Sequence, residues 1–297
     1  VSGDNLGQVH PIRSGAAITH DTTRTIKRDL RVNFGVAATA AINPLTDRIM
    51  PFMLIGGTAW PLGRYMFTDE TDVISTGGTL GDMALVDEMF IVDQQQSSAF
   101  SSDLSATAAI VAFLDAQPPL PGVDVEGSPY PAVGSWAPGT TGGQILEALA
   151  TQGDYMSPWF DNVGFFRMVR TIDPDVAVPT LDFDRGNRVI AGTISETSDL
   201  LRAPNRFIVA SNSSEAAGDA IVGTYDVPPS APYSIAQRGF AIPQVVNLQL
   251  ANPAQATAVA RNLGIRQSVF RRTQLATAPD PRHDSYDVIR WQGVNWL

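Results

Sequence analysis

The sequence predicts an α+β fold in which strands dominate. Short runs with the two-residue apolar period of half-buried strands recur along the chain, separated by turns rich in proline and glycine. Only three segments have the three- and four-residue spacing of an amphipathic helix. Many short strands joined by such turns favour small barrels or sandwiches.

One of these helical segments begins a helix–hairpin unit at residues 142–171. Its apolar face comprises Ile145, Leu146 and Leu149, and Gly153 is placed to end the helix in a left-handed conformation. Two apolar runs follow, joined by the turn formers of 161–164. A helix and hairpin this small are marginal in isolation, so we expect each to pack against the other as a small satellite core.

Strands are expected on the N-terminal side of this unit. Residues 22–34 place Ile26, Leu30, Val32 and Phe34 on one face. Segments 49–55 and 59–67 are expected to pair across Gly56-Gly57-Thr58 as a hairpin. Residues 37–42 suit a helical turn or a loop, 68–79 a polar loop, and 83–92 another strand.

The other two helices are expected at 104–114 and 252–263. The first has Asp103 as its candidate cap and a face made by Leu104, Ala108, Val111 and Leu114. The second has Asn252 as cap and Pro253 at its first position, and Gly264 is expected to end it. The proline-rich stretch 117–141 is expected to be a long ordered loop or linker.

The rest of the C-terminal half is predicted to be almost entirely strand. The expected strands are 180–183, 188–196, 206–210, 220–225, 245–250, 268–274 and 284–291.

Composition excludes several functional classes. The chain has no cysteine, which removes disulfide scaffolds, thiolate nucleophiles and sulfur-bound zinc. Its net charge of −10 opposes binding to a phosphate backbone. The basic clusters at 24–28 and 271–272 are interpreted as exposed charges on strand faces. No apolar run is long enough to span a membrane, and residues 1–4 do not resemble a signal peptide.

No catalytic set emerges from the sequence. His10, His20 and His283 lie far apart in polar surroundings, so no metal site is expected. Carboxylates recur at Asp173/Asp175, Asp182/Asp184 and Asp69/Glu70/Asp72, and such pairs leave a glycosidase as an open alternative. Another alternative is an adhesion or carbohydrate-binding module in which Trp60, Trp136 and Trp159 are exposed platforms. The missing catalytic set favours a structural or binding role without cofactors.

Several segments, in this order, resemble the tail-tip hub proteins of long-tailed bacteriophages, also called minor tail or baseplate hub proteins. The segments that carry the resemblance are Arg24–Phe34, Trp60–Phe67, the unit at 142–170, Pro204–Val209, Pro232–Ile235 with Gly239, the helix at 252–263 and Tyr286–Ile289. Their order along the chain gives the resemblance its weight.

The resemblance implies two small β-barrel-like hub domains, at 1–100 and 179–297, flanking an inserted α/β region at 101–178. It implies a homotrimer in the virion tail tip, in contact with a distal tail ring or tail tube protein and with other tip and fibre proteins. Such a ring closes or continues the tail tube, organises tip attachment and lets genomic DNA pass without specific binding. The family has no catalytic residues in this core, so the resemblance implies no enzyme activity.

Overall fold

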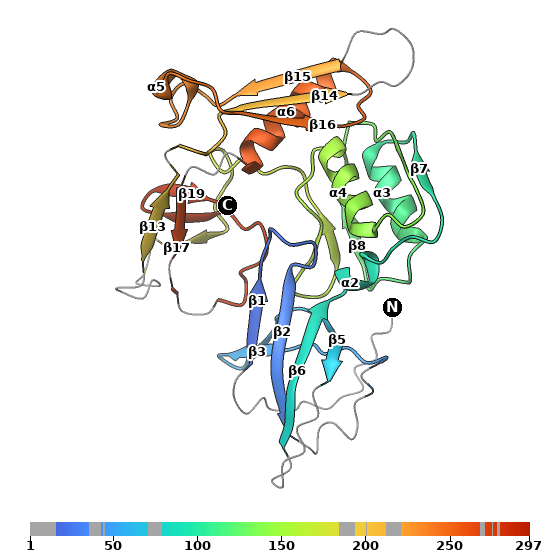
Figure 1. Ribbon diagram of the computed structural model, residues 1–297. Coiled ribbons are helices and arrows are strands. Elements are labelled where there is room, and N and C mark those ends of the chain that lie inside the picture. The colour runs from blue at the N-terminus through green and yellow to red at the C-terminus, as the bar shows by residue number, and fades with distance from the viewer. Residues whose placement is uncertain are drawn as a thin grey trace.

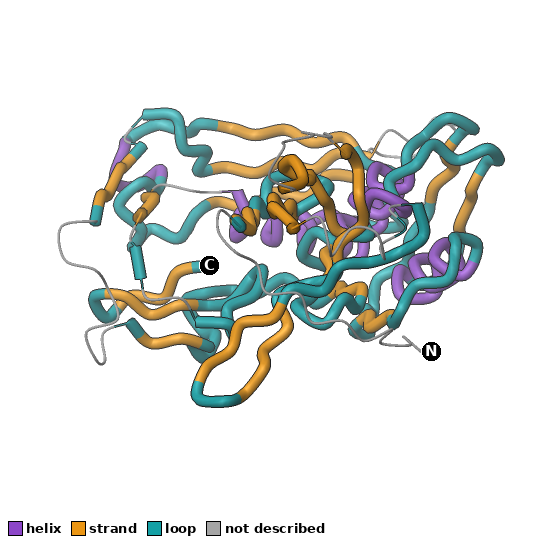
Figure 2. The backbone as a smooth tube through the Cα atoms, turned by 90° about the horizontal axis from the view of Figure 1, so that it is seen from below, coloured by secondary structure: helices purple, strands orange, loops and turns teal. Residues whose placement is uncertain are grey.

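The computed structural model describes residues 16–35, 43, 45–70, 79–183, 194–199, 201–211, 221–267, 271–274, 276–277 and 280–297. Within these ranges several small sheets outweigh the helices, which confirms strand dominance (Figures 1 and 2). None of the sheets built by the described residues closes into a barrel, so the barrel-like form stays a prediction.

An antiparallel four-stranded sheet forms the lower part of Figure 1. Its strands, in spatial order, are β1 (Ala17–His20), β2 (Arg28–Gly35), β6 (Thr79–Asp87) and β5 (Tyr65–Glu70). Its small core comprises Leu30, Val32, Tyr65, Met83 and Leu85. The strand predicted at 22–34 therefore begins later, at Arg28. Before it, the Asp21 carboxylate accepts hydrogen bonds from the Thr23 backbone and hydroxyl and holds a turn.

A separate hairpin joins β3 (Phe52–Ile55) to β4 (Thr58–Pro61), as the sequence predicts. Gly56 and Gly57 have φ values of 57° and 83°, which a two-residue turn of this kind requires. The predicted second strand, 59–67, is split in two. At Gly63 φ is 114°, and the chain turns there to enter the four-stranded sheet as β5.

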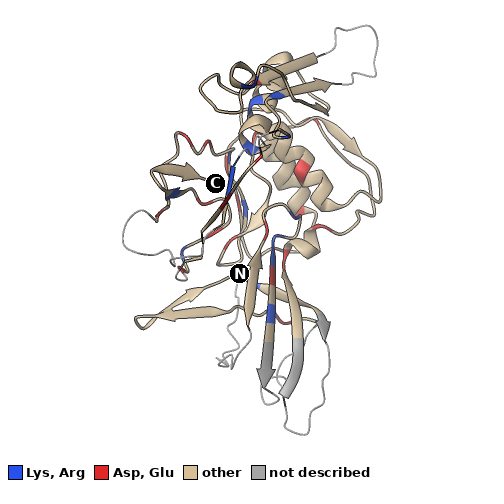
Figure 3. Ribbon diagram, turned by 60° about the vertical axis from the view of Figure 1, so that its left-hand side comes forward, with Lys and Arg blue, Asp and Glu red and all other residues tan. Residues whose placement is uncertain are grey.

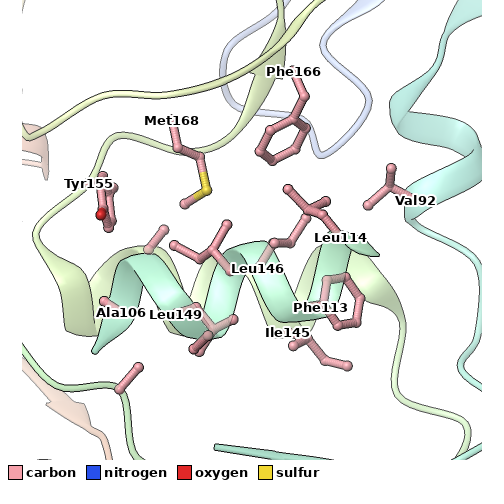
Figure 4. Packing of buried hydrophobic residues seen from close by; sticks show 14 of the residues in the cluster. Val92, Ala106, Phe113, Leu114, Ile145, Leu146, Leu149, Tyr155, Phe166 and Met168 are labelled. Carbon is pink, nitrogen blue, oxygen red and sulfur yellow. The ribbon is translucent and has the colours of Figure 1, made fainter. Parts of the chain in front are cut away.

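The largest core lies at the right of Figure 1 and is enlarged in Figure 4. Its elements are α2 (Met89–Val92), α3 (Ala106–Asp115), β8 (Val123–Val125), α4 (Gly142–Gly153), β10 (Trp159–Phe160) and β11 (Phe166–Met168). Leu146 and Leu149 of α4 pack in one buried cluster with Phe166 and Met168, so the predicted helix–hairpin contact is confirmed. The cluster also takes in α2 and α3, so it is larger than the small satellite core that we expected.

The limits of these helices differ from the predicted ones. The strand expected at 83–92 ends at Asp87 and becomes α2. The left-handed residue after α4 is Asp154, not Gly153. Helix α3 is capped by Ser105, whose hydroxyl accepts from the Ala108 N–H, rather than by Asp103.

The buried face of α3 matches the predicted one only at Leu114, which is 5% exposed. Leu104 and Val111 are 46% and 39% exposed, whereas Ala109, Ile110 and Phe113 are buried. The helix is apolar on every side, so spacing could not choose the face. The proline-rich stretch after α3 is ordered, as one alternative expected, because β9 (Gly134–Trp136) pairs with β7 (Phe100–Ser102) and β8 pairs with β11.

A three-stranded sheet at the top of Figure 1 is covered on one face by α6 (Pro253–Gln267). Its order is β15 (Ile221–Asp226), β14 (Arg206–Ser211) and β16 (Pro243–Asn247), with α5 (Ile235–Arg238) between β15 and β16 in the chain. Helix α6 continues past Gly264, where it was expected to end. A Cβ at Gly264 would lie 2.4 Å from the Tyr225 ring, so this glycine allows close helix–sheet packing.

Short strands complete the described chain. They are β12 (Leu181–Asp182), β13 (Ser195–Ser198), β17 (Arg271–Gln274), β18 (Ile289–Trp291) and β19 (Val294–Trp296). The strand expected at 284–291 is therefore confined to its last three residues. Predictions for 1–15, 37–42, 188–193 and 268–270 fall outside the described residues.

Candidate assembly surfaces

The carboxylate pairs do not converge into a catalytic site within the described chain. Asp173 accepts from the Asp175 N–H at 3.2 Å and pairs with Arg261 at 3.0 Å, as expected of a turn and a surface ion pair. Asp182 lies in β12. Asp184 and Asp72 lie outside the described residues, as do the side chains of Asp69 and Glu70.

The structure brings two of the three histidines to one cleft. His20 and His283 both line a cavity of about 280 Å³, beside Asn162 and Asp280. Asp280 is paired with Arg282 at 2.6 Å. Among the described residues, no group of three or more potential ligands could hold a metal ion, and His10 lies outside them.

The tryptophans do not form exposed platforms. Trp159 is 6% exposed and its ring meets Tyr286 edge-on at 5.1 Å between centroids. Trp136 packs on Phe100 at 5.7 Å against the largest core. Trp60 is partly covered and lies opposite Met53 in the β3–β4 hairpin. Trp159 and Trp136 therefore pack in the interior of the protein.

Sequence reasoning missed a buried polar junction around Arg28. The cluster at 24–28 was expected to be exposed, but Lys27 and Arg28 are 2% and 1% exposed. The Arg28 guanidinium pairs with Asp284 and donates to the Asn162 side chain at 2.9 Å. The Arg28 backbone N–H donates to Asp87 at 3.1 Å. The junction thus ties β2 and β6 to the β10–β11 turn and to the C-terminal segment.

Burial raises the pKa values of two acids in this junction, Asp87 and Asp284. Loss of solvation raises the pKa of Asp87 to about 6, although the Met89 and Arg28 N–H groups and the charge of Arg28 oppose the shift. Burial also raises the pKa of Asp284. The signal in the sequence was weak, because a basic cluster before a strand is usually solvated. Arg271 and Arg272, by contrast, are exposed as predicted.

The β3–β4 hairpin exposes an apolar surface, here called the hairpin face. Cross-strand register puts Phe52, Leu54, Ala59 and Pro61 on one side. Phe52 and Leu54 are 52% and 73% exposed. No charged residue occurs from Ile49 to Gly63, and in Figure 3 the projecting hairpin is tan, without the blue of Lys and Arg or the red of Asp and Glu.

The base of the hairpin is fixed. Arg48 and Arg64 flank the uncharged run and both pair with Glu88, at 3.3 and 3.6 Å. The Glu88 side chain is 5% exposed, so this ion pair is little screened by solvent. The Gly63 N–H also donates to the Asn162 carbonyl at 2.8 Å. The structure therefore holds an apolar arm away from its own cores.

The three-stranded sheet presents a second apolar surface, opposite α6, here called the open sheet face. Its apolar residues are Ile208, Ala210, Val222, Pro243 and Val245, and the register puts the uncharged polar residues Thr224 and Asn247 on the same side. Val222 and Val245 are 47% and 59% exposed. Arg206 and Asp226 share this side and neutralise each other through two contacts of 2.7 Å.

The fold is similar to crystal structures of tail proteins. One is the 43 kDa tail protein of prophage MuSo2 from Shewanella oneidensis (TM-score 0.54, 13% identity, 95% of this chain and 86% of that chain covered). Another is the tail protein from Neisseria meningitidis MC58 (0.56, 14%, 90% and 76%). A third is prophage tail protein gp18 from Listeria monocytogenes EGD-e (0.54, 8%, 91% and 77%).

These likenesses establish the fold over nearly the whole chain. No protein-family model and no curated protein matches the sequence. No helix in the described part of the chain is both long and apolar enough to cross a membrane.

Proposed function

We propose that this chain is a structural component of a bacteriophage tail, acting as a hub ring at the tail tip. The observation that carries the proposal is the fold, which matches three tail proteins over 90% or more of this chain. The order of segments that resembles tail-tip hubs supports the narrower assignment. The exposed hairpin face and open sheet face suit a protein that functions by assembly.

The proposed hub is a homotrimer. Its tube domains are residues 1–100 and 179–297, and its insert is 101–178. The ring closes or continues the tail tube, organises the attachment of tip and fibre proteins, and contacts a distal ring or tube protein. Genomic DNA passes through it without specific binding, and the net charge of −10 suits a passage that does not hold phosphate. The proposed role is non-enzymatic and needs no cofactor.

Immunogold labelling of intact particles tests the location. Antibodies raised against the full chain are expected to mark the tail tip, with unlabelled capsids as the internal control. Labelling confined to the capsid, or particles that lack the chain altogether, would contradict the proposal. A tail position away from the tip would retain the tail role and refute the hub assignment.

An adhesion or carbohydrate-binding module is the second candidate. It depended on exposed tryptophans, and the burial of Trp159 and the packing of Trp136 remove two of the three platforms. No observation on the described residues favours it over the tail role.

A further inference from the structure

We infer that the hairpin face of one copy packs on the open sheet face of the next copy of this chain. The inference rests on the proposed trimeric hub and names the surfaces that would build it. A ring needs a heterologous contact, in which two different patches of the same chain meet. The described residues supply two such patches, at well-separated places in the molecule (Figure 1).

A partner that covers its exposed face would stabilise the hairpin. A two-stranded sheet is at best marginally stable unless it packs on further structure. Here β3 and β4 contact each other far more than either strand contacts any other element, and Leu54 stays 73% exposed. The Arg48–Glu88–Arg64 cluster nevertheless holds the arm in place. Exposed apolar side chains are unfavourable in water, and a second surface that covers the arm removes them from water.

The charge pattern selects the receiving surface. Burying an unpaired charge against the uncharged hairpin would weaken the contact, so the surface that receives the hairpin should be neutral where the two meet. The open sheet face meets this condition, because its polar residues Thr224 and Asn247 are uncharged and its two charges, Arg206 and Asp226, already pair with each other. A second copy therefore offers a surface that is electrically neutral where the hairpin would meet it.

The shapes also agree. The hairpin face is a two-stranded sheet, and the open sheet face is one side of a three-stranded sheet on which Val222 and Val245 stay exposed among the described residues. Two such sheets pack face to face about 10 Å apart, with side chains interdigitating between them. Ile208, Val222 and Val245 would then cover Phe52 and Leu54, so that each surface gains a second layer.

Cysteine crosslinking of the full chain tests this pairing, because the native sequence contains no cysteine. We expect the double variant Leu54→Cys/Val245→Cys to form disulfide-linked dimers and trimers under mild oxidation. Each single variant should remain uncrosslinked, since a heterologous contact brings unlike positions together. The matched control Leu54→Cys/Val178→Cys uses another exposed valine, 88% exposed, and should not crosslink.

The outcomes separate the alternatives. Crosslinking of the Leu54→Cys single variant would show hairpin meeting hairpin and overturn the inference. Absence of crosslinks in the double variant would overturn it as well. If a hub trimer forms without this crosslink, the proposed function stands and the pairing fails. If tip labelling fails, the proposed function falls, whatever the crosslinking shows.

An assembly measurement gives an independent check. Leu54→Asp and Val245→Asp should each weaken self-association roughly tenfold or more, because each buries an unpaired carboxylate. A mixture of the two variants should yield one-to-one dimers, since each copy keeps one intact surface. Val178→Asp should assemble as wild type. Unfolding midpoints equal to that control would show that the variants fold, and failure of the mixture to form dimers would refute the pairing.

Discussion

Single residues at the Arg28 junction hold three distant parts of the chain together. Arg28 comes from β2, Asp87 from the end of β6, and Asp284 from the C-terminal segment. The Asp87 carboxylate accepts from two backbone N–H groups, of Arg28 and Met89, at 3.1 and 3.0 Å. These hydrogen bonds lower the pKa of Asp87, but the loss of solvation raises it by more, so the pKa of this acid stays above its ordinary value.

Asp87→Asn is expected to change the pH dependence of stability. The pKa in the folded protein, about 6, lies above the ordinary 3.8, so the folded state binds the proton more tightly than the unfolded chain. The stability of wild type relative to the variant should therefore rise as pH falls from about 6 to about 4, by about 3 kcal/mol at most. Urea unfolding of both proteins across this range measures the difference.

Asp226→Asn supplies the control, with the opposite sign. Its hydrogen bonds from Arg206 lower the pKa of this exposed carboxyl, so the stability that it contributes is lost as the pH falls. A pH-independent difference between wild type and Asp87→Asn would mean that Asp87 is not held in the folded state as described.

Local sequence signals predicted where some turns and helices lie, but they did not predict which face of a helix is buried or which charged residues lie in the interior. The turn at Gly56-Gly57 and the starts of helices α4 and α6 carry their own turn and cap residues, so the sequence placed them well, whereas α6 continues past its expected end at Gly264. Helix α3 carries no such guidance about its face, because it is apolar all round. The burial of Arg28 depends on Asp284, 256 residues away, and no local pattern reveals it.

Leu149→Ala tests the helix–hairpin core. Leu149 is fully buried among residues of α3, α4 and β11, so the variant should lose about 2–5 kcal/mol of unfolding free energy. Because the cluster is shared, hydrogen exchange should accelerate across 106–115, 142–153 and 166–168 together. Val111→Ala, at a 39% exposed position of α3, should have little effect. Acceleration confined to α4 would show that the helix does not depend on its neighbours.

For the whole molecule, the fold class could be predicted from the sequence, but the two candidate assembly surfaces could not. Recurring short strands indicate a strand-dominated α+β chain, and the structure confirms it. The sequence of residues 49–63 shows an apolar hairpin, but only the three-dimensional arrangement shows that no core of the described chain covers its outer face. Likewise, the exposure of Val222 and Val245 depends on α6 taking the opposite side of the sheet.

We propose that three copies of this chain form a hub at a phage tail tip. Electron cryo-microscopy of the tail tip in intact particles reports the position, the copy number and the contacts of the chain in one measurement. We expect three copies around the tail axis, with the hairpin face of each against the open sheet face of its neighbour. A ring of six copies, or a tail tip from which this chain is absent, would refute the trimeric hub.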